Sequence, residues 1–334
     1  MSKDKRSLER IDLLLTQRGL APSREQARAL IMAGEVRVNG QPVAKAGTLV
    51  PRDAVCELSP SGAGLRFVSR GGLKLERALD AFALDPTGLV CLDVGASTGG
   101  FTDLLLQRGA RRVYAVDVGH GQLAWSLRTN ERVVVMEGAN IRLLTSLPEP
   151  IDCAVIDVSF ISLRLVLPAV ARLLTPQAWV VALVKPQFEA GRAEADRGAG
   201  VIRDPTTHRR ILRDLLTWLA TPPTPLEIEV ARSPGDPQAA QRLVARRLIP
   251  SPITGREGNH EYLLLMAVST AGEQHATREP FVTEGMTTAS EQVGDAEIEQ
   301  AISDAFGDTP TAKRVQENQD PRRLRASEQD RGEA

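Results

Sequence analysis

Several features are scarce or missing in this chain of 334 residues, and each absence excludes a class of protein. The three cysteines, Cys56, Cys91 and Cys153, are too few and too scattered for a disulfide framework or a zinc site, and the four histidines form no metal-ligand cluster. The apolar runs, such as 179–184, are far shorter than the roughly 20 residues that span a bilayer. The amino terminus has no apolar stretch, so we expect no secretory signal. Together these absences predict a cytoplasmic protein without a metal centre.

Aromatic residues make up only 4% of the chain, so the core is expected to be aliphatic. The formal net charge of −1 conceals an uneven distribution: 1–80 hold 14 basic and 9 acidic residues, whereas 271–334 hold 7 basic and 14 acidic. Hydrophobic periodicity fades after 269, and we expect 271–334 to be an acidic, mostly disordered tail with at most a short helix at 296–306. The basic front favours a polyanionic partner, although a solvated charged surface has a similar composition.

Residues 1–65 have the pattern of a small mixed module. Apolar residues recur at helical spacing in 8–15 and again in 23–31, where Ser23 begins a capping box. The alternating stretch that follows contains Asn39-Gly40, a strong signal for a tight hairpin turn. Beyond the module, 66–88 are expected to form a flexible linker and then the first helix of the next domain.

The segment SREQARALIMAGEVRVNGQPV resembles the S4 RNA-binding domain. This resemblance implies binding of structured RNA through a basic face. We expect Arg24 and Arg28 on the second helix, Arg37 on the following strand and Arg70 beyond the module to contact RNA. Surface arginines without a ligand are the alternative interpretation.

From residue 89 the pattern changes to apolar strands that alternate with helices. We expect strands at 89–94, 113–117, 133–136, 151–157, 179–184, 226–230 and 262–268, and helices at 101–108, 163–174 and 208–219. The alternation predicts an α/β domain over 89–270, with a mostly parallel, Rossmann-like sheet that is covered by helices on both faces.

The segment DVGASTGGF follows the first of these strands and opens a helix. Its glycines let the backbone approach a ligand at the carboxyl edge of the sheet. The glycine spacing is neither the GxGxxG of nicotinamide binding nor the GxxxxGK of a nucleotide loop. It resembles the S-adenosylmethionine loop of class I methyltransferases, which implies cofactor contacts from Asp93, Gly95, Ser97, Thr98, Gly99, Gly100 and Phe101.

Asp117 ends the second strand, 24 residues after Asp93. An acid at this position can accept hydrogen bonds from both ribose hydroxyls of a nucleoside cofactor. Asn140, just after the third strand, is expected to contact adenine, with a plain surface turn as the alternative. The loop and Asp117 together favour S-adenosylmethionine over a nicotinamide.

Charged residues also end two later strands. Asp157 ends the fourth, and Lys185 directly follows four apolar residues of the fifth, where burial of a lysine is costly unless the lysine is paired or functional. The sequence after Asp157 lacks the two prolines of amino methyltransferases acting on bases, and Cys153 lacks the preceding proline of cytosine C5 enzymes.

These residues resemble the Lys-Asp-Lys-Glu tetrad of ribose 2′-O-methyltransferases related to FtsJ. Carried over, the catalytic tetrad is Lys74 in SRGGLKL, Asp157, Lys185 and Glu261 in GNHEY. Lys185 is then the expected base or steering group for the hydroxyl. Asp157 is expected to lie against the cofactor as well.

With the S4-like front, these motifs resemble the TlyA family over roughly residues 8–268. Members of that family are described both as hemolysins and as ribosomal RNA cytidine 2′-O-methyltransferases. The resemblance implies methyl transfer from S-adenosylmethionine to a ribose 2′-hydroxyl, with ribosomal RNA or a ribosomal subunit as the partner. The acidic tail lies outside it.

Two other functions stay open at this point. A hemolysin-like, membrane-active protein would need a membrane span or a strongly amphipathic cationic helix, and the sequence offers neither. An RNA-binding protein without activity would not need four candidate catalytic residues. The modified nucleotide and the oligomeric state do not follow from the sequence.

Overall fold

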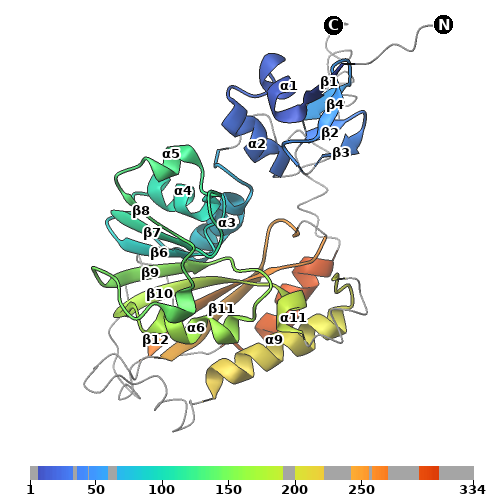
Figure 1. Cartoon of the computed structure of the whole chain (residues 1–334). Helices are drawn as coiled ribbons and strands as arrows, with labels where there is room; N and C mark the ends of the chain where they lie inside the picture. Colours follow the sequence, from blue (N-terminus) through green and yellow to red (C-terminus); the bar gives the residue numbers. More distant parts are fainter. Residues whose placement is uncertain are drawn as a thin grey trace, which may run out of the picture.

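The computed structural model describes residues 7–32, 36–43, 45–58, 66–190, 200–221, 242–255, 258–269 and 293–307. They form a small amino-terminal module and a larger α/β domain (Figure 1). The strand predicted at 226–230 lies outside the described residues. Among the helices that are described, none is long and apolar enough to cross a membrane.

The described part of the small module contains two helices and two small sheets. The helices α1 (Ile11–Gln17) and α2 (Arg24–Met32) pack on each other. Strand β1 (Leu8–Arg10) pairs with β4 (Leu49–Pro51), and β2 (Val36–Val38) pairs with both β3 (Gln41–Pro42) and β5 (Cys56–Leu58).

Two local predictions for the module are confirmed and one is wrong. Asn39 and Gly40 both adopt positive φ, as a tight hairpin turn requires, and Ser23 Oγ accepts a hydrogen bond from the Gln26 amide. Leu8 was assigned to the first helix by its spacing, but it lies on β1 and is exposed. The helix begins at Ile11, whose side chain is fully buried.

The stretch that joins module and domain is packed where it is described, which corrects the prediction of a flexible linker. Phe67 is buried among the apolar residues of the α/β domain, and Asp103 accepts a hydrogen bond from the Val68 amide. Helix α3 (Gly71–Phe82) begins directly after it. A Cβ atom on Gly72 would lie 2.3 Å from the Phe67 ring, so glycine here serves close packing rather than flexibility.

The α/β domain is built on one sheet of seven strands in the order β11-β12-β10-β9-β6-β7-β8. The strands are β6 (Val90–Val94), β7 (Arg112–Asp117), β8 (Val133–Glu137), β9 (Ile151–Ile156), β10 (Leu174–Val184), β11 (Arg242–Pro250) and β12 (Tyr262–Ser269). The five strands from β6 to β10 are parallel, whereas β12 runs antiparallel to both of its neighbours. The predicted Rossmann-like α/β fold is confirmed, and β11 is a strand that the sequence pattern did not predict.

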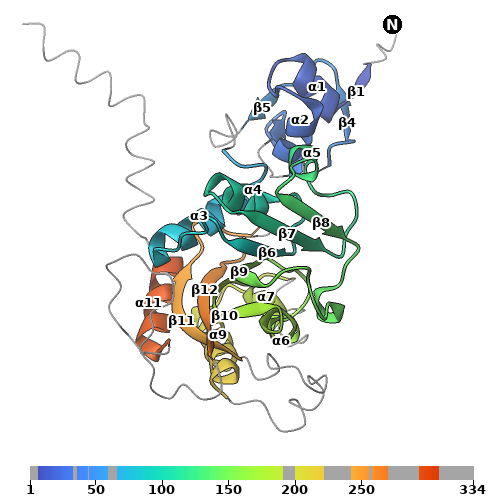
Figure 2. The ribbon, with the colours of Figure 1, turned by 90° about the vertical axis from the view of Figure 1, so that its left-hand side faces the viewer.

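Helices cover both faces of this sheet (Figures 1 and 2). One face packs against α3, α4 (Gly100–Gln107) and α5 (Trp125–Arg128). The other packs against α6 (Leu167–Ala171), α9 (Pro205–Ala220) and α11 (Asp295–Phe306). The short elements η2 (Ile141–Leu143), η3 (Leu163–Leu165) and α7 (Pro186–Glu189) follow strands β8, β9 and β10. The single helix predicted over 163–174 is therefore divided into η3 and α6, and Leu174 already belongs to β10.

Helix α11 lies in the acidic segment that was expected to be mostly disordered. Its residues Ile298, Ala301 and Ile302 are buried in the same apolar cluster as α9 and β12. The short helix allowed for at 296–306 is thus present, and it is docked on the domain.

Candidate active site

The chain reverses its strand order between β6 and β9, and the carboxyl ends of these two strands form the centre of the site. In a parallel sheet this reversal opens a crevice at that edge. Here the two ends are in direct contact, because the Asp157 amide donates a 2.9 Å hydrogen bond to the Val94 carbonyl. Gly95 has φ of +84°, and a Cβ atom on it would lie 2.6 Å from the Asp157 carbonyl oxygen. Only glycine allows the loop to pass so close to β9.

The rest of the glycine segment divides into a turn and a packed helix start. Ser97 and Gly99 both have positive φ, which turns the backbone between β6 and α4. Gly100 faces inward: its Cβ would lie 2.3 Å from Ser69 Oγ and 2.9 Å from the Gly72 amide. Phe101 is buried in the core with α3. Of the predicted cofactor contacts, Gly95, Ser97 and Thr98 are at least partly exposed in this loop. Gly99 is buried, and its Cβ would lie 2.2 Å from the Leu127 side chain, while Gly100 and Phe101 lie between the helices.

Asp117 lies beside this loop, as its position at the end of β7 predicted. One carboxylate oxygen accepts a 2.7 Å hydrogen bond from the Ser97 amide, and the other accepts one of 2.7 Å from the Gly119 amide. Each oxygen keeps a second lone pair. Asn140 begins η2, and its side chain accepts a hydrogen bond from the Arg142 amide. The structure thus shows the turn that was the alternative interpretation of Asn140.

Glu137 at the end of β8 is a residue that the sequence analysis missed. Its carboxylate accepts hydrogen bonds from the amides of 121, 122 and 123, and it forms an ion pair with Arg128 at 2.7 Å. The Arg128 guanidinium, helped by these amides, lowers the pKa of Glu137 to about 2. This carboxylate fixes the loop that follows Asp117.

Asp93 is fully buried inside β6. One oxygen accepts a 2.6 Å hydrogen bond from Thr102 Oγ1, and Oδ1 has no hydrogen-bond partner among the described residues. Burial raises the pKa of Asp93 to about 7, and the negative charges of Asp157 and Asp117 add to that effect against the Thr102 hydrogen bond. An uncompensated carboxylate therefore lies directly beneath the glycine loop.

Lys185 and Asp157 meet at the carboxyl edge of the sheet. Lys185 Nζ lies 2.7 Å from Asp157 Oδ1 and donates a 2.8 Å hydrogen bond to Ser159 Oγ. The lysine is only 9% exposed, so its charge is compensated by these partners rather than by water. Ser159 was not predicted as a site residue, although it belongs to the segment that carries Asp157.

Lys74 and Glu261 form a second pair at the same place. Lys74 Nζ on α3 lies 2.5 Å from Glu261 Oε2, and Glu261 is 4% exposed. Burial raises the pKa of Glu261, while the charge of Lys74 opposes the shift, and Asp157 and Lys185 are close enough to act on it as well. The structure therefore brings together all four residues of the predicted tetrad, from segments up to 187 residues apart.

Phe160 is the most unusual side chain near these pairs. It is 90% exposed, and its φ of +63° lies in the left-handed region that a bulky residue rarely adopts. Its ring centroid is 5.1 Å from that of Phe188, and Lys185 Nζ lies 5.9 Å from the Phe188 centroid. Glu189 anchors the segment after Phe160 by accepting hydrogen bonds from Ser162 Oγ and the Leu163 amide. The residues after Lys185 therefore supply both an aromatic ring, Phe188, and an anchor, Glu189, and neither was predicted as a site residue.

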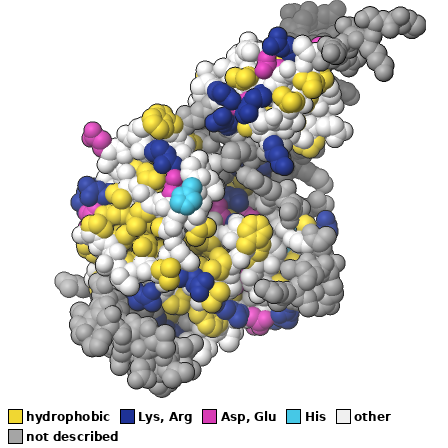
Figure 3. Space-filling view, in the orientation of Figure 1, with side chains coloured by type: hydrophobic (Ala, Val, Ile, Leu, Met, Phe, Trp, Pro, Cys, Tyr) yellow, Lys and Arg dark blue, Asp and Glu magenta, His cyan; other side chains and the backbone are white. Residues whose placement is uncertain are grey.

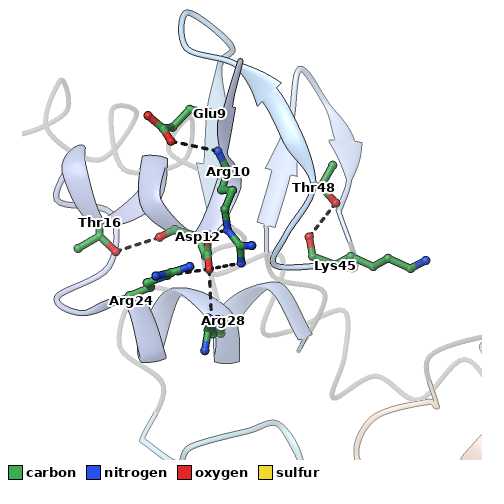
Figure 4. Close-up of polar contacts among 8 residues, drawn as sticks. All are labelled: Glu9, Arg10, Asp12, Thr16, Arg24, Arg28, Lys45 and Thr48. Atoms are coloured by element: carbon green, nitrogen blue, oxygen red, sulfur yellow. Dashed lines mark hydrogen bonds and ion pairs between the residues drawn. The ribbon is translucent and has the colours of Figure 1, made fainter. Parts of the chain in front are cut away.

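A separate group of charges lies on the small module, where Figure 3 shows Lys and Arg side chains gathered. Arg10, Arg24 and Arg28 surround the buried carboxylate of Asp12, with N–O distances of 2.9, 2.9 and 3.3 Å to Oδ2 (Figure 4). Hydrogen bonds from Arg10, and then from Arg24 and Arg28, hold the pKa of Asp12 well below its usual range despite burial. We call this group the arginine cluster.

The arginine cluster contains two of the four predicted RNA contacts. Arg10 and Asp12 were not predicted, because nothing in their local sequence distinguishes them from other surface charges. Arg37 is exposed and donates to the Gly40 carbonyl at the hairpin turn. Arg70 is half-buried at the start of α3, in the α/β domain.

Comparisons with known proteins agree with this architecture. Residues 67–222 match the FtsJ-like methyltransferase family, and 9–56 match the S4 domain. The 16S/23S rRNA (cytidine-2′-O)-methyltransferase TlyA of Mycobacterium tuberculosis is 45% identical to this chain over 267 residues, which cover 78% of this chain and 90% of that protein. The chain belongs to the TlyA family.

Other members of the family are similar over most of their length. Hemolysin A of Brachyspira hyodysenteriae is 36% identical over 258 residues, which cover 76% of this chain and 98% of that protein. The solved structure of a hemolysin-like protein from Streptococcus thermophilus is 36% identical, with a TM-score of 0.62 over 92% of this chain and 99% of that one. As a member of the TlyA family with an FtsJ-like domain, the chain is a methyltransferase that uses S-adenosylmethionine as methyl donor.

The titration of Asp93 leads to a testable prediction. An unfolded aspartate has a pKa of about 3.9, well below the value of about 7 in the fold. The stability that its protonated form contributes is therefore complete below about pH 4 and is lost as the pH rises through 7. We expect the free energy of unfolding of Asp93→Asn, relative to wild type, to rise by about 1 kcal/mol between pH 6 and 8.5.

Denaturant titrations of the cofactor-free proteins measure this difference at each pH. Asp85→Asn, at an exposed aspartate ahead of β6, is the matched control and should show no such trend. A wild-type to Asp93→Asn difference that is constant over this range would contradict the titration of Asp93.

Proposed function

We propose that this enzyme transfers a methyl group from S-adenosylmethionine to the ribose 2′-hydroxyl of a cytidine in ribosomal RNA. The observation that carries the proposal is the meeting of the Lys74–Glu261 and Lys185–Asp157 pairs beside the glycine loop. The TlyA relative is named for this reaction on 16S and 23S rRNA, which supports the substrate assignment. Such a substrate, as free RNA or as a ribosomal subunit, requires a cytoplasmic enzyme.

The residues around the glycine loop fit the cofactor. S-adenosylmethionine supplies an electrophilic methyl group on a positively charged sulfur. The unpartnered oxygen of Asp93 gives the crevice a negative potential that favours a positively charged ligand. Asp117 would accept hydrogen bonds from the ribose hydroxyls, and the backbone of 95–99 would line the adenosine and methionine portions. Gly100 and Phe101 would support this site from the core rather than contact the cofactor.

Lys185 is the residue proposed to act on the attacking hydroxyl. Its ammonium group has three donors, of which Ser159 Oγ accepts one, while Asp157 Oδ1 lies 2.7 Å from Nζ as the ion-pair partner. A donor therefore remains for the ribose oxygen. The hydroxyl loses its proton as the oxygen–methyl bond forms and the methyl–sulfur bond breaks. We propose that Lys185 and Asp157 take up that proton as a unit, because a lysine that has passed a proton to Asp157 can accept another.

The Lys74–Glu261 pair is proposed to fix the geometry around this unit. Its two charges cancel, so it holds its place in the crevice without attracting ions of either sign. Phe160 would stack on the target base, since an exposed aromatic ring next to a catalytic crevice is the usual platform for a base that leaves its helix. Base stacking there would bring the attached ribose toward Lys185.

RNA recognition is proposed to belong to the small module. The domains would then be an S4-like module at 1–65, a junction at 66–88 and the methyltransferase domain at 89–270, with 271–334 as an acidic extension. Arg24 and Arg28 contact Asp12 through Nε, so Asp12 does not use the terminal amino groups of either residue. These groups, with four N–H donors each, can grip phosphates of the RNA backbone.

The first prediction from this proposed function tests the reaction and Lys185 together. Purified enzyme is expected to transfer tritium from labelled S-adenosylmethionine to ribosomal RNA, with the label recovered as 2′-O-methylcytidine. In Lys185→Ala we expect kcat to fall at least about 100-fold, the scale for losing a general base, while cofactor binding persists. Lys45→Ala removes an exposed lysine of the small module and should keep kcat at saturating RNA.

Two results would overturn this assignment. Near-normal turnover by Lys185→Ala would remove Lys185 from the reaction. Lysis of red cells by the purified protein, without any methyl transfer to RNA, would favour the membrane-active alternative.

The second prediction concerns the ribose contact of Asp117. Loss of hydrogen bonds to a charged acceptor typically costs about 1.5–3 kcal/mol, so Asp117→Ala should bind S-adenosylmethionine at least about 10-fold more weakly. Calorimetry measures this, with Asp85→Ala as a control that removes an exposed acid without touching the loop. If both variants bind like wild type, Asp117 does not hold the ribose.

The third prediction concerns the arginine cluster. Each phosphate contact contributes about 0.7–0.9 to the slope of log affinity against log salt, so Arg24→Ala/Arg28→Ala should reduce that slope by about 1.5 and weaken RNA binding. Arg111→Ala/Arg112→Ala is the matched control, because it removes two exposed arginines that pair with Glu149 instead. Equal slopes for the two double variants would show that the cluster does not grip RNA.

A further inference from the structure

Helix α11 lies outside the residues that match either family, yet it is tied to the α/β domain by charge as well as by apolar contacts. Its carboxylates pair with arginines of α9 and β11: Arg209–Glu299 at 2.5 Å, Arg213–Asp295 at 2.7 Å and Arg247–Glu297 at 3.3 Å. Glu297 also accepts a 2.9 Å hydrogen bond from the Leu248 amide of the edge strand β11. The helix therefore has one defined place on the sheet (Figure 2).

The last residue of α11 completes a ring cluster that adjoins Glu261. The Phe306 centroid lies 4.3 Å from that of His260 and 4.8 Å from that of His208. His208 Nε2 donates to the Ile202 carbonyl at 2.9 Å, and the Tyr262 hydroxyl donates to His208 Nδ1 at 2.9 Å. Burial lowers the pKa of His208, which agrees with the neutral ring that these two bonds require.

Alternation along the chain puts this cluster behind the catalytic crevice. Tyr262 belongs to the apolar cluster of α9 and α11, whereas the following residue, Leu263, belongs to that of α3. Glu261 likewise points to the α3 side, where it meets Lys74. The two neighbours of Glu261 in the sequence are thus held from the opposite side, His260 by Phe306 and Tyr262 by His208.

The backbone ahead of Glu261 is anchored to the segment 200–202 by Asn259. Asn259 is buried, accepts a 3.0 Å hydrogen bond from the Ile202 amide and donates one of 2.9 Å to the Gly200 carbonyl. The Ile202 carbonyl is also the acceptor for His208. The segments 200–202 and 259–262 therefore form one unit, and Phe306 packs on its exposed end.

We propose that Phe306 is a positioning residue for methyl transfer, which fixes Glu261, and through it Lys74, by packing against His260 and His208. The inference rests on the proposed function, because it takes Glu261 as part of the catalytic group. A displacement of about 1 Å in a catalytic group can reduce a rate on the order of 100-fold. Loss of the ring contact between Phe306 and His260, the residue next to Glu261, is therefore sufficient to affect turnover.

The test compares kcat and KM for Phe306→Ala, Phe306→Tyr and Ser303→Ala in the full chain. We expect Phe306→Ala to lower kcat about 10-fold, while KM for RNA and the affinity for S-adenosylmethionine change less than about twofold. Phe306→Tyr keeps the ring and should restore kcat. Ser303→Ala alters an exposed side chain on the same helix and should behave like wild type.

A double-mutant cycle with Glu261→Gln shows whether Phe306 acts through Glu261. If it does, Glu261→Gln/Phe306→Ala will be no slower than Glu261→Gln alone. The inference is overturned if the fold reductions in kcat from the two substitutions multiply in the double variant. It is also overturned if Phe306→Ala keeps the wild-type kcat while Glu261→Gln is impaired. A wild-type kcat in Glu261→Gln would instead refute the proposed role of Glu261.

A second measurement does not depend on activity. Hydrogen exchange of the amides in 258–263 should be faster in Phe306→Ala than in Ser303→Ala, because the unit that carries Glu261 has lost its outer contact. Unchanged exchange there would refute the positioning role whatever the substrate of the enzyme is.

Discussion

The enzyme depends on balancing four charges whose side chains are mostly buried. Lys74, Asp157, Lys185 and Glu261 come from four separate segments, and each would be costly to bury alone. As two pairs they have no net charge, so no bound counterion is needed to compensate them. The balance also links function to stability, because removal of one partner leaves the other buried and unpaired. Variants at these positions must therefore be judged by turnover and by folding stability together.

The sheet topology is what makes this meeting possible. Parallel strands deliver Asp157 and Lys185 to the same edge, since both residues directly follow the carboxyl ends of their strands. The reversed direction of β12 then brings its beginning to that edge, where Tyr262 is paired with Val184. Glu261 thereby lies opposite Lys185, although 76 positions of sequence separate them. An additional parallel strand would have put its first residues at the far side of the sheet.

Two members of this centre, Asp157 and Lys185, could be predicted from strand ends, whereas Lys74 and Glu261 followed only from the resemblance to the tetrad of ribose 2′-O-methyltransferases. An acid or a lysine directly after an apolar run has few structural reasons to be there, and the glycine spacing narrowed the choice of cofactor. Features that depend on distant packing were missed. Strand β11 has the sequence RLVARRLIP, in which arginines interrupt the alternation of apolar and polar residues. The strand still forms, because it lies at the edge of the sheet and contains a bulge between Ala245 and Arg247. Gly71-Gly72 suggested flexibility, because the Phe67 ring that requires glycine there is visible only in three dimensions. Helix α11 has only three buried apolar residues, too few for its docking to be evident from composition.

Charge balance also distinguishes the two halves of the proposed enzyme. In the crevice two lysines meet two carboxylates, and the pairs satisfy each other. In the arginine cluster three arginines meet the single carboxylate of Asp12, so positive charge remains on the surface after the buried acid is satisfied. Asp12 neutralises one of the three positive charges, but it holds three long side chains in one arrangement. Less conformational entropy is then lost when these side chains bind a ligand. A chain with almost no net charge can therefore carry an ordered positive surface on the small module and two neutral ion pairs at the edge of the sheet.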